Sequence, residues 1–195
     1  MVDTEAVRAF FDRLAPQWDA EMIRSDAIIG TILDNACVGP GTTVLDVACG
    51  TGVLIPDYLA RGVRAVTAID LSPEMVRIAR QKFREPNVTI LCGDAEREPF
   101  AERFDRIVVY NALPHFPDPA RLIGRLSALL APGGVLTVAH GMSREAIDRH
   151  HRNTGDAVSM GLPPADALAQ MFADCLRVTT VRSDDTMYQV AGTKK

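Results

Sequence analysis

Acidic residues stand where several predicted strands end, and they are the first candidates for a ligand site. Asp46 lies inside the apolar run 43–47, and Asp70 and Asp94 follow the next two runs. In an open parallel sheet, ligands bind beyond the carboxyl ends of the strands. A carboxylate accepts hydrogen bonds from hydroxyl and amino groups, which suits Asp70 to a ribose and Asp94 to an adenine amino group. These acids therefore predict a site for a nucleoside-like cofactor.

The first apolar run breaks into a turn that contains Gly50 and Gly52, where the backbone can approach a ligand closely. A dinucleotide-binding turn has a third glycine three residues after the second, a position that Ile55 occupies here. A carboxylate near the turn, such as that of Asp46, attracts an ammonium or sulfonium and repels phosphate. The turn therefore favours a cofactor with a cationic amino-acid tail over a dinucleotide.

Histidines near the same sheet edge are the candidate catalytic bases. His140 follows the fifth predicted strand, and His115 lies in the loop Pro-His-Phe-Pro after the fourth. The alternatives are a histidine satisfied by backbone at 140 and a loop-shaping residue at 115. His150 and His151 lie on a predicted polar helix, where a solvated face or a lid-like role over His140 are the two interpretations. A metal site built from these side chains lacks any preset ligand spacing, so we predict no metal.

The elements that must position these residues alternate between strand and helix. Predicted strands cover 43–47, 63–69, 88–91, 104–110 and 135–139, and predicted helices cover 4–14, 19–36, 53–60, 72–85, 118–130, 143–152 and 164–173. Two further strands, 176–181 and 187–192, are separated by a short polar turn, which is typical of an antiparallel hairpin. The pattern predicts an α/β fold: a three-layer, doubly wound, mostly parallel seven-stranded sheet with a C-terminal antiparallel hairpin.

We expect one domain over residues 1–195, with internal parts of different roles. Residues 1–38 form an N-terminal helical cap, 40–140 the cofactor-binding core, and 141–195 the substrate-side helices and edge hairpin. Trp18, the only tryptophan, lies in the joint between the two cap helices. It either anchors their packing or belongs to a lid over the cofactor pocket.

The bulk properties exclude several classes of protein. A net charge of -4 and a pI near 5.6 argue against a generic nucleic-acid binder, because no basic surplus is available for phosphates. The scattered cysteines, without a Cys-x-x-Cys pair, predict reduced thiols in a cytoplasmic protein. We find no signal peptide and no apolar run long enough for a bilayer. We therefore expect a small-molecule substrate, no nucleic acid and no membrane span, and we consider a homodimer.

The stretch Val-Leu-Asp-Val-Ala-Cys-Gly-Thr-Gly at 44–52 resembles motif I of the class I, seven-strand S-adenosylmethionine-dependent methyltransferases. Further stretches resemble the ribose, adenine, fourth-strand and fifth-strand motifs of that family, in order: 68–75, 92–95 with Pro99-Phe100, 104–113 and 130–136. The most similar branch is the small-molecule group that includes the ubiquinone and menaquinone methyltransferases. Residues 111–114 read Asn-Ala-Leu-Pro instead of Asn-Pro-Pro-Tyr, which disfavours N-methylation of a nucleobase.

The resemblance implies S-adenosylmethionine as co-substrate and a set of residues that bind it. These are Asp46, Gly50 and Gly52 at the methionine moiety, Asp70 at the ribose, Asp94 and Ala95 at the adenine, Met75 beside the base, and Ala48, Leu71 and Asn111 as further contacts. It implies methyl transfer to an O, S, N or C atom of a small molecule, with His140 or His115 as base. The alternatives are a non-catalytic, cofactor-binding regulatory protein and a nicotinamide dehydrogenase, which Ile55 and Asp46 disfavour.

Overall fold

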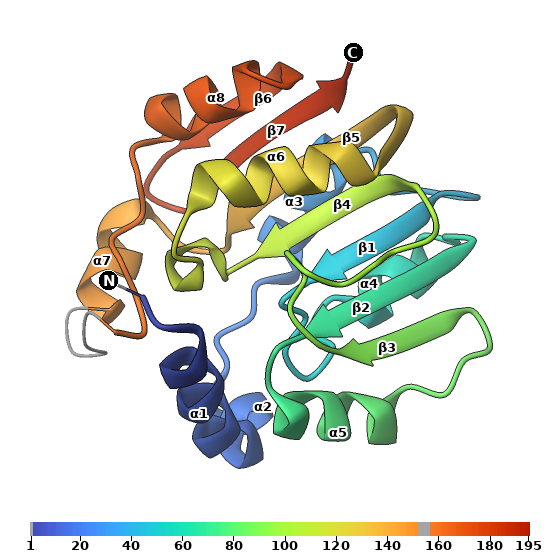
Figure 1. Ribbon diagram of the computed structural model, residues 1–195, viewed down its shortest axis with the longest axis vertical. Coiled ribbons are helices and arrows are strands. Elements are labelled where there is room, and N and C mark those ends of the chain that lie inside the picture. The colour runs from blue at the N-terminus through green and yellow to red at the C-terminus, as the bar shows by residue number, and fades with distance from the viewer. Residues whose placement is uncertain (1, 152–156) are drawn as a thin grey trace.

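The computed structural model describes residues 2–151 and 157–195, with His150 and His151 described as backbone alone. All its strands belong to one seven-stranded sheet in the order β3-β2-β1-β4-β5-β7-β6 (Figure 1). The strands are β1 (Thr43–Val47), β2 (Ala65–Asp70), β3 (Val88–Cys92), β4 (Phe104–Tyr110), β5 (Leu130–His140), β6 (Leu176–Ser183) and β7 (Tyr188–Lys194). Strands β1 to β5 are parallel, whereas β7 is antiparallel to both β5 and β6. The predicted α/β sheet with a C-terminal hairpin is confirmed.

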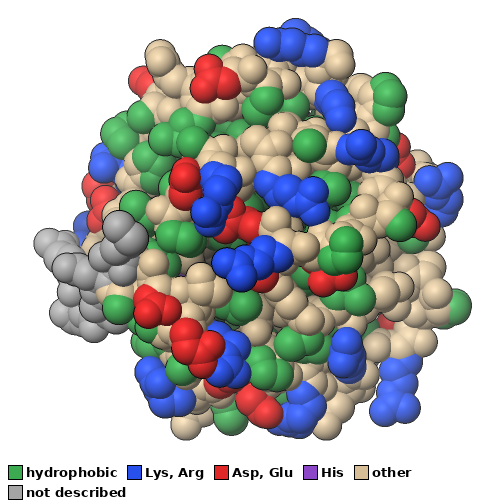
Figure 2. All heavy atoms as spheres, in the orientation of Figure 1, with side chains coloured by type: hydrophobic (Ala, Val, Ile, Leu, Met, Phe, Trp, Pro, Cys, Tyr) green, Lys and Arg blue, Asp and Glu red, His purple; other side chains and the backbone are tan. Residues whose placement is uncertain are grey.

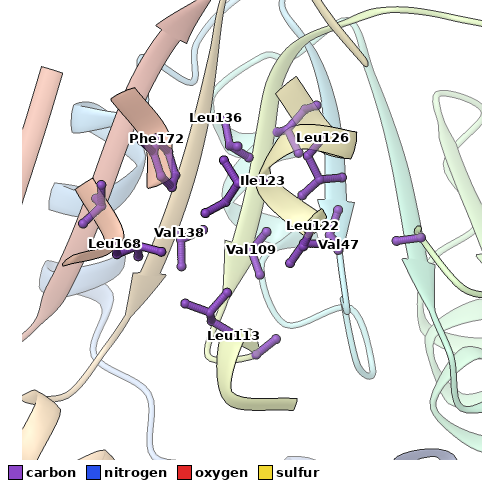
Figure 3. Close-up of a cluster of buried hydrophobic side chains, with 14 of the residues drawn as sticks. Val47, Val109, Leu113, Leu122, Ile123, Leu126, Leu136, Val138, Leu168 and Phe172 are labelled. Carbon is purple, nitrogen blue, oxygen red and sulfur yellow. The ribbon is translucent and has the colours of Figure 1, made fainter. Parts of the chain in front are cut away.

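Helices cover both faces of this sheet (Figure 1). They are α1 (Thr4–Leu14), α2 (Trp18–Glu21), α3 (Asp26–Asn35), α4 (Ile55–Ala60), α5 (Pro73–Lys82), α6 (Pro119–Leu129), α7 (Arg144–His151) and α8 (Ala165–Ala173). On one face, α6 and α8 pack against the strands through Leu122, Leu126, Leu168 and Phe172 (Figure 3). On the other face lie α3, α4 and α5, which contribute Leu33, Tyr58 and Val76.

Every residue of β1 is buried, because helices pack on both sides of it. Side chains alternate between the two faces, so Leu45 and Val47 join the α6–α8 core and Val44 joins the α3–α5 core. Asp46 has the same parity as Val44 and therefore points to the α3–α5 side, toward Tyr58. Strand alternation thus fixes which face holds the one charged residue of β1.

The predicted helix 19–36 is wrong in its extent, because α2 and α3 are separate and Met22 to Ser25 join them. Arg24 holds this joint in place. Its guanidinium donates to the Val53 carbonyl (2.9 Å) and to Asp57 Oδ1 (2.7 Å). These contacts cross 29 and 33 residues of sequence, so helical periodicity could not reveal the break.

The fifth strand begins earlier than predicted, at Leu130 instead of 135. Leu130 pairs with Phe104, and the register then shifts before Arg106 pairs with Val135. Gly133 has φ +72°, a left-handed conformation that favours glycine and lets the strand absorb the extra residues.

Charged side chains of both signs alternate over the face shown in Figure 2, with apolar side chains between them. Within residues 2–151 and 157–195, none of the helices combines the length and the apolar character that crossing a bilayer requires.

Candidate active site

A cavity opens at the carboxyl ends of β1 to β4, beneath the N-terminal helices. Its space, counted together with the open mouth, is about 1140 Å³. The residues that were predicted to bind a cofactor line this cavity, apart from Gly52: Asp46, Ala48, Gly50, Asp70, Leu71, Met75, Asp94, Ala95 and Asn111. The topology therefore brings the separate sequence motifs to one place.

The backbone at the cavity wall is strained in two adjacent strands. Ala48 follows β1 with φ +56°, and Asn111 follows β4 with φ +54°. A left-handed conformation costs a residue with a Cβ about 1–2 kcal/mol, and such strain is concentrated at functional sites. The Asn111 amide nitrogen donates to the Ala139 carbonyl, and its Oδ1 accepts from Gly141, both at 2.9 Å. Contacts with the end of β5 therefore hold Asn111 in its strained form.

The structure gives Gly52 a role other than the predicted cofactor contact. This glycine has φ +84° and is absent from the cavity wall. A Cβ at position 52 would stand 2.5 Å from Phe83 Cε2 and 2.9 Å from Ile55 Cδ1. Gly52 is therefore required for close packing behind the turn, whereas Gly50 lies at the cavity itself.

Asp46 is the unusual group of the site. Its side chain is 2% exposed, and Oδ2 is buried without a hydrogen-bond partner among the described residues. Burial raises the pKa of Asp46 to about 8; the adjacent Tyr58 hydroxyl opposes this rise and the charge of Asp70 adds to it. Tyr58 Oη itself does not reach hydrogen-bonding geometry with the carboxyl. Asp46 therefore presents an unsatisfied acceptor that a bound cation would stabilise in its charged form.

Asp70 connects the glycine turn to the end of β2. Its Oδ2 accepts from the Gly50 amide (2.8 Å), and its Oδ1 accepts from the Ser72 amide (2.9 Å). Burial raises the pKa of Asp70 to about 6, although the hydrogen bonds from Ser72 and Gly50 favour the charged form. Each carboxylate oxygen has a second lone pair, so both can also accept from a vicinal diol.

The turn after β3 carries Asp94, whose Oδ1 accepts from the Glu96 amide at 2.9 Å. Helix α6 holds this turn from outside: Arg121 forms a bidentate ion pair with Glu96, at 2.7 and 3.0 Å. Arg125 adds a hydrogen bond to the Glu98 carbonyl at 2.6 Å. The wall beside Asp94 is therefore braced by charge-assisted hydrogen bonds, which are stronger than neutral ones.

The N-terminal helices form one wall of the cavity through Phe11, Trp18 and Met22, among others. Two acids attach them to the core. Asp12 accepts from the Ser72 hydroxyl (2.5 Å) and from the backbone at the start of α5. Asp19 accepts from the Thr51 hydroxyl (2.5 Å).

Asp19 also pairs with Lys82 of α5, at 2.8 Å. Burial acts to raise the pKa of Asp19, but the hydrogen bonds from Lys82 and Thr51 outweigh burial and lower this pKa. Because Asp19 is the neighbour of Trp18, this ion pair fixes the part of the chain that carries the indole ring.

The two candidate bases differ in position. His115 lines the cavity, its Nδ1 lies 2.9 Å from the Val158 carbonyl, and its ring packs edge-on against Phe11. His140 is 2% exposed, packs edge-on against Tyr188, and is not part of the cavity wall. The geometry therefore supports His115 over His140 as a group that meets a substrate.

The predicted roles of the His150 and His151 side chains lie outside the described residues. Among the residues that are described, the structure contains no cluster of three or more His, Cys, Asp or Glu side chains suited to a metal ion.

Sequence reasoning missed several residues of the wall, notably Tyr110, Phe116 and Glu96. It also missed the attachment of the N-terminal helices through Asp12 and Asp19. The sequence offered only weak signals for these residues: Asp19 stands next to the only tryptophan, and Glu96 stands two residues after Asp94. Their partners are 25 to 63 residues away along the chain, which no local pattern reveals.

Comparison with known proteins identifies the same region. Residues 44–134 match the family model described as a methyltransferase domain. The ubiquinone biosynthesis O-methyltransferase of Xanthomonas campestris pv. campestris is 41% identical over 101 residues, which cover 50% of this chain and 42% of that protein. The chain spans about half the length of the curated relatives it matches.

Solved structures share the fold over nearly the whole chain. One belongs to the complex between the Haloferax volcanii Trm112 methyltransferase activator and a methyltransferase, with a TM-score of 0.83, 21% identity, and coverage of 96% of this chain and 97% of that one. Another is the N-methyltransferase NodS from Bradyrhizobium japonicum in complex with S-adenosyl-L-homocysteine, with a TM-score of 0.75, 17% identity, and coverage of 97% and 98%.

Proposed function

Because the chain carries a class I S-adenosylmethionine-dependent methyltransferase domain, we propose that it transfers the methyl group of this cofactor to a small-molecule nucleophile. One observation carries the proposal. Three carboxylates near the carboxyl ends of the adjacent strands β1, β2 and β3, those of Asp46, Asp70 and Asp94, line a single cavity. This cavity lies beside a glycine turn that lacks the third glycine of a dinucleotide site.

The residues of the cavity fit S-adenosylmethionine in their chemistry, and they follow the order of its parts: methionine end, ribose and adenine. The unsatisfied, buried carboxyl of Asp46 suits the cationic methionine end. Asp70 suits the ribose diol, because both its oxygens are already oriented by backbone amides. Asp94 with the buried Ala95 suits the adenine amino group and ring, and Met75 and Leu71 add apolar surface beside them.

When bound, the cofactor supplies a methyl group on a positively charged sulfur. An acceptor lone pair forms the new bond to this carbon while the bond from carbon to sulfur breaks, which leaves neutral S-adenosylhomocysteine. The protein's part in such an in-line transfer is to align the acceptor and exclude water. Phe11, Met22 and Phe116 provide apolar wall for this purpose.

An acceptor with a hydroxyl group must also lose a proton, and His115 is the base that we propose for it. The Val158 carbonyl can only accept a hydrogen bond, so the proton of the neutral ring resides on Nδ1. Nε2 is then the basic nitrogen. A thiol or a stabilised carbanion would depend less on this group.

The test has a binding arm and a turnover arm. Isothermal titration should detect S-adenosylhomocysteine binding, and a coupled assay should detect its release from S-adenosylmethionine in the presence of phenols, quinols, thiols, amines or carboxylic acids. Absence of binding at millimolar ligand would refute the proposal. Binding without release across the whole panel would favour the regulatory alternative.

We also propose the finer features expected from the sequence: a cytoplasmic location, a homodimer without nucleic-acid ligands, and a division into cap (1–38), core (40–140) and substrate-side region (141–195). Light scattering of the purified protein tests the dimer, and a monomeric mass at micromolar concentration would rule it out. Cell fractionation tests the location.

A further inference from the structure

One buried serine connects Asp70, at the end of β2, to helix α1. The Ser72 amide donates to Asp70 Oδ1 at 2.9 Å, and the Ser72 hydroxyl donates to Asp12 Oδ1 at 2.5 Å. Asp12 belongs to α1, whereas Ser72 immediately precedes α5 and is fully buried. The two acids are therefore joined through a single residue, although Asp12 and Ser72 lie 60 residues apart in sequence.

The direction of the hydrogen bonds in this chain of contacts is fixed. The Met75 amide donates to Ser72 Oγ at 3.1 Å, so this oxygen is an acceptor in that contact. The hydroxyl has one proton, and a carboxylate only accepts, so the proton of Ser72 is directed to Asp12. The Glu74 amide also donates to Asp12 Oδ1, at 3.3 Å. Asp12 thus binds the start of α5 from outside and fixes the Ser72 side chain.

A change at Asp12 should reach Asp70 through Ser72. Without the Asp12 carboxylate, the buried Ser72 hydroxyl loses the acceptor that it has now, and a buried donor without an acceptor is costly. Ser72 must then move to find another partner, and its amide, which supports Asp70 Oδ1, moves with it. Asp12 does not line the cavity, so its effect on a bound ligand passes through this chain of contacts.

The second attachment of the N-terminal helices has no such connection. Asp19 accepts from the Thr51 hydroxyl at 2.5 Å and pairs with Lys82 at 2.8 Å. Lys82 is the last residue of α5, at the opposite end from Ser72. Among the described residues, the hydrogen bonds that Asp70 accepts from Gly50 and Ser72 involve neither Thr51 nor Lys82. Asp19 is therefore a matched control for Asp12.

We infer that Asp12 is a positioning residue for the cofactor's ribose: through Ser72, it holds Asp70 in the geometry that accepts the ribose diol. This inference rests on the proposed function and deepens it. The contact that attaches α1 is also the contact that orients the ribose acceptor. Attachment of α1 and binding of the cofactor are therefore coupled, and each favours the other.

The test measures how much the ribose diol contributes to binding. The ligand 5′-methylthioadenosine carries the diol without the amino-acid tail, and its 2′,3′-dideoxy analogue lacks the diol. For the wild-type protein, the analogue should have a Kd at least about tenfold higher, because hydrogen bonds to a charged carboxylate are strong. Asp12→Ala should reduce this factor to about threefold or less. Asp19→Ala should leave it within about twofold of the wild-type value, because it lies outside the chain of contacts.

The conservative variant Asp12→Asn separates positioning from a purely structural role. Its side-chain oxygen can still accept from the Ser72 hydroxyl, so the diol should keep its contribution within about twofold at neutral pH. The same variant removes a negative charge near Asp70, which gives the test a second measurement.

That measurement is the pH dependence of the diol's contribution. Burial raises the pKa of Asp70 to about 6, and the negative charge of Asp12 acts in the same direction. The diol donates best to a charged Asp70, so its contribution should rise between about pH 5 and about pH 7 in the wild type. In Asp12→Asn, this rise should occur at lower pH. The other ionisable groups around the two acids are the same in both proteins: Asp46, Cys49, Cys92 and Arg8.

Three results would each overturn the inference and leave the proposed function intact. They are an unchanged diol contribution in Asp12→Ala, an equal loss in Asp19→Ala, and a rise in Asp12→Asn at the same pH as in the wild type. Binding of S-adenosylhomocysteine shows that a variant is folded, and if Asp12→Ala does not fold, the pH profile of Asp12→Asn decides. If the wild-type protein binds neither S-adenosylhomocysteine nor 5′-methylthioadenosine, the proposed function fails, and the inference fails with it.

Discussion

Replacing Asp46 with Asn should remove a strong pH dependence from the binding of S-adenosylhomocysteine. The buried carboxyl has a pKa of about 8, so it is mostly protonated at neutral pH before a ligand binds. A cationic tail favours the charged form, and its binding must therefore release the proton. Affinity should consequently rise as the pH increases toward 8.

The size of this effect follows from the pKa. Each pH unit below 8 adds about 1.4 kcal/mol to the cost of ionising the carboxyl, which is about tenfold in Kd. Between about pH 6 and about pH 7, the Kd of the wild-type protein should therefore fall by up to about tenfold. Asp46→Asn has no proton to release, so its dependence should be nearly flat in that interval.

Asp70 titrates in the same range, because its pKa is about 6, and it needs a separate control. The tail-less ligand 5′-methylthioadenosine contacts the ribose site without reaching Asp46. The ratio of the two Kd values, measured by isothermal titration at each pH, therefore isolates Asp46. A ratio that does not change with pH in the wild-type protein would refute the assignment of Asp46 to a cation.

Three further outcomes are expected. Asp46→Asn should be more stable than the wild type near neutral pH, by up to about 4 kcal/mol. The reason is that the pKa of Asp46 rises from 3.8 in the unfolded chain to about 8 in the folded one, so the unfolding free energy of the wild type decreases as the pH rises between these values. Thermal melts at about pH 7 and about pH 5 test this, and a stability difference between the two proteins that is the same at both pH values would contradict it. Asp70→Ala should weaken both S-adenosylhomocysteine and 5′-methylthioadenosine at least about tenfold, since it removes the ribose acceptor and releases the Gly50 amide; selective loss of one ligand would argue against the ribose assignment. Gly52→Ala should destabilise by about 2 kcal/mol or more, because the new Cβ meets Phe83, whereas Gly124→Ala, with open space in the middle of α6, should stabilise by about 0.5–1 kcal/mol; urea unfolding measures both, and equal effects would contradict the packing argument.

Local sequence patterns were sufficient for the fold class and for much of the cavity wall. The alternation of apolar runs and capped helices predicts that most strands are parallel, because parallel strands need crossover connections, which are usually helices. Since carboxyl ends of parallel strands share one edge, the positions of Asp46, Asp70 and Asp94 along the chain already placed them at one site.

The sequence alone did not determine which residues of the motifs face the cavity. Gly50 and Gly52 are the same residue type in one motif. Gly50 nevertheless lies at the cavity and Gly52 packs against Phe83, because a turn presents alternate residues to opposite sides. His140 stands at a strand end like the acids, but its ring packs against Tyr188. The direction of a side chain at a strand end depends on the neighbouring strand, and only the strand pairing in the structure shows which strand is the neighbour.

The tertiary structure alone decided how the N-terminal helices attach beside the cavity. The contacts of Asp12 with Ser72 and of Asp19 with Thr51 and Lys82 join segments that are distant in sequence. Such contacts depend on the packing of whole helices, because hydrogen bonds form only at distances and angles that the fold sets. For the same reason, the sequence could not predict that Trp18 Nε1 and Asp46 Oδ2 would lie buried beside one glycine turn, each without a partner among the described residues.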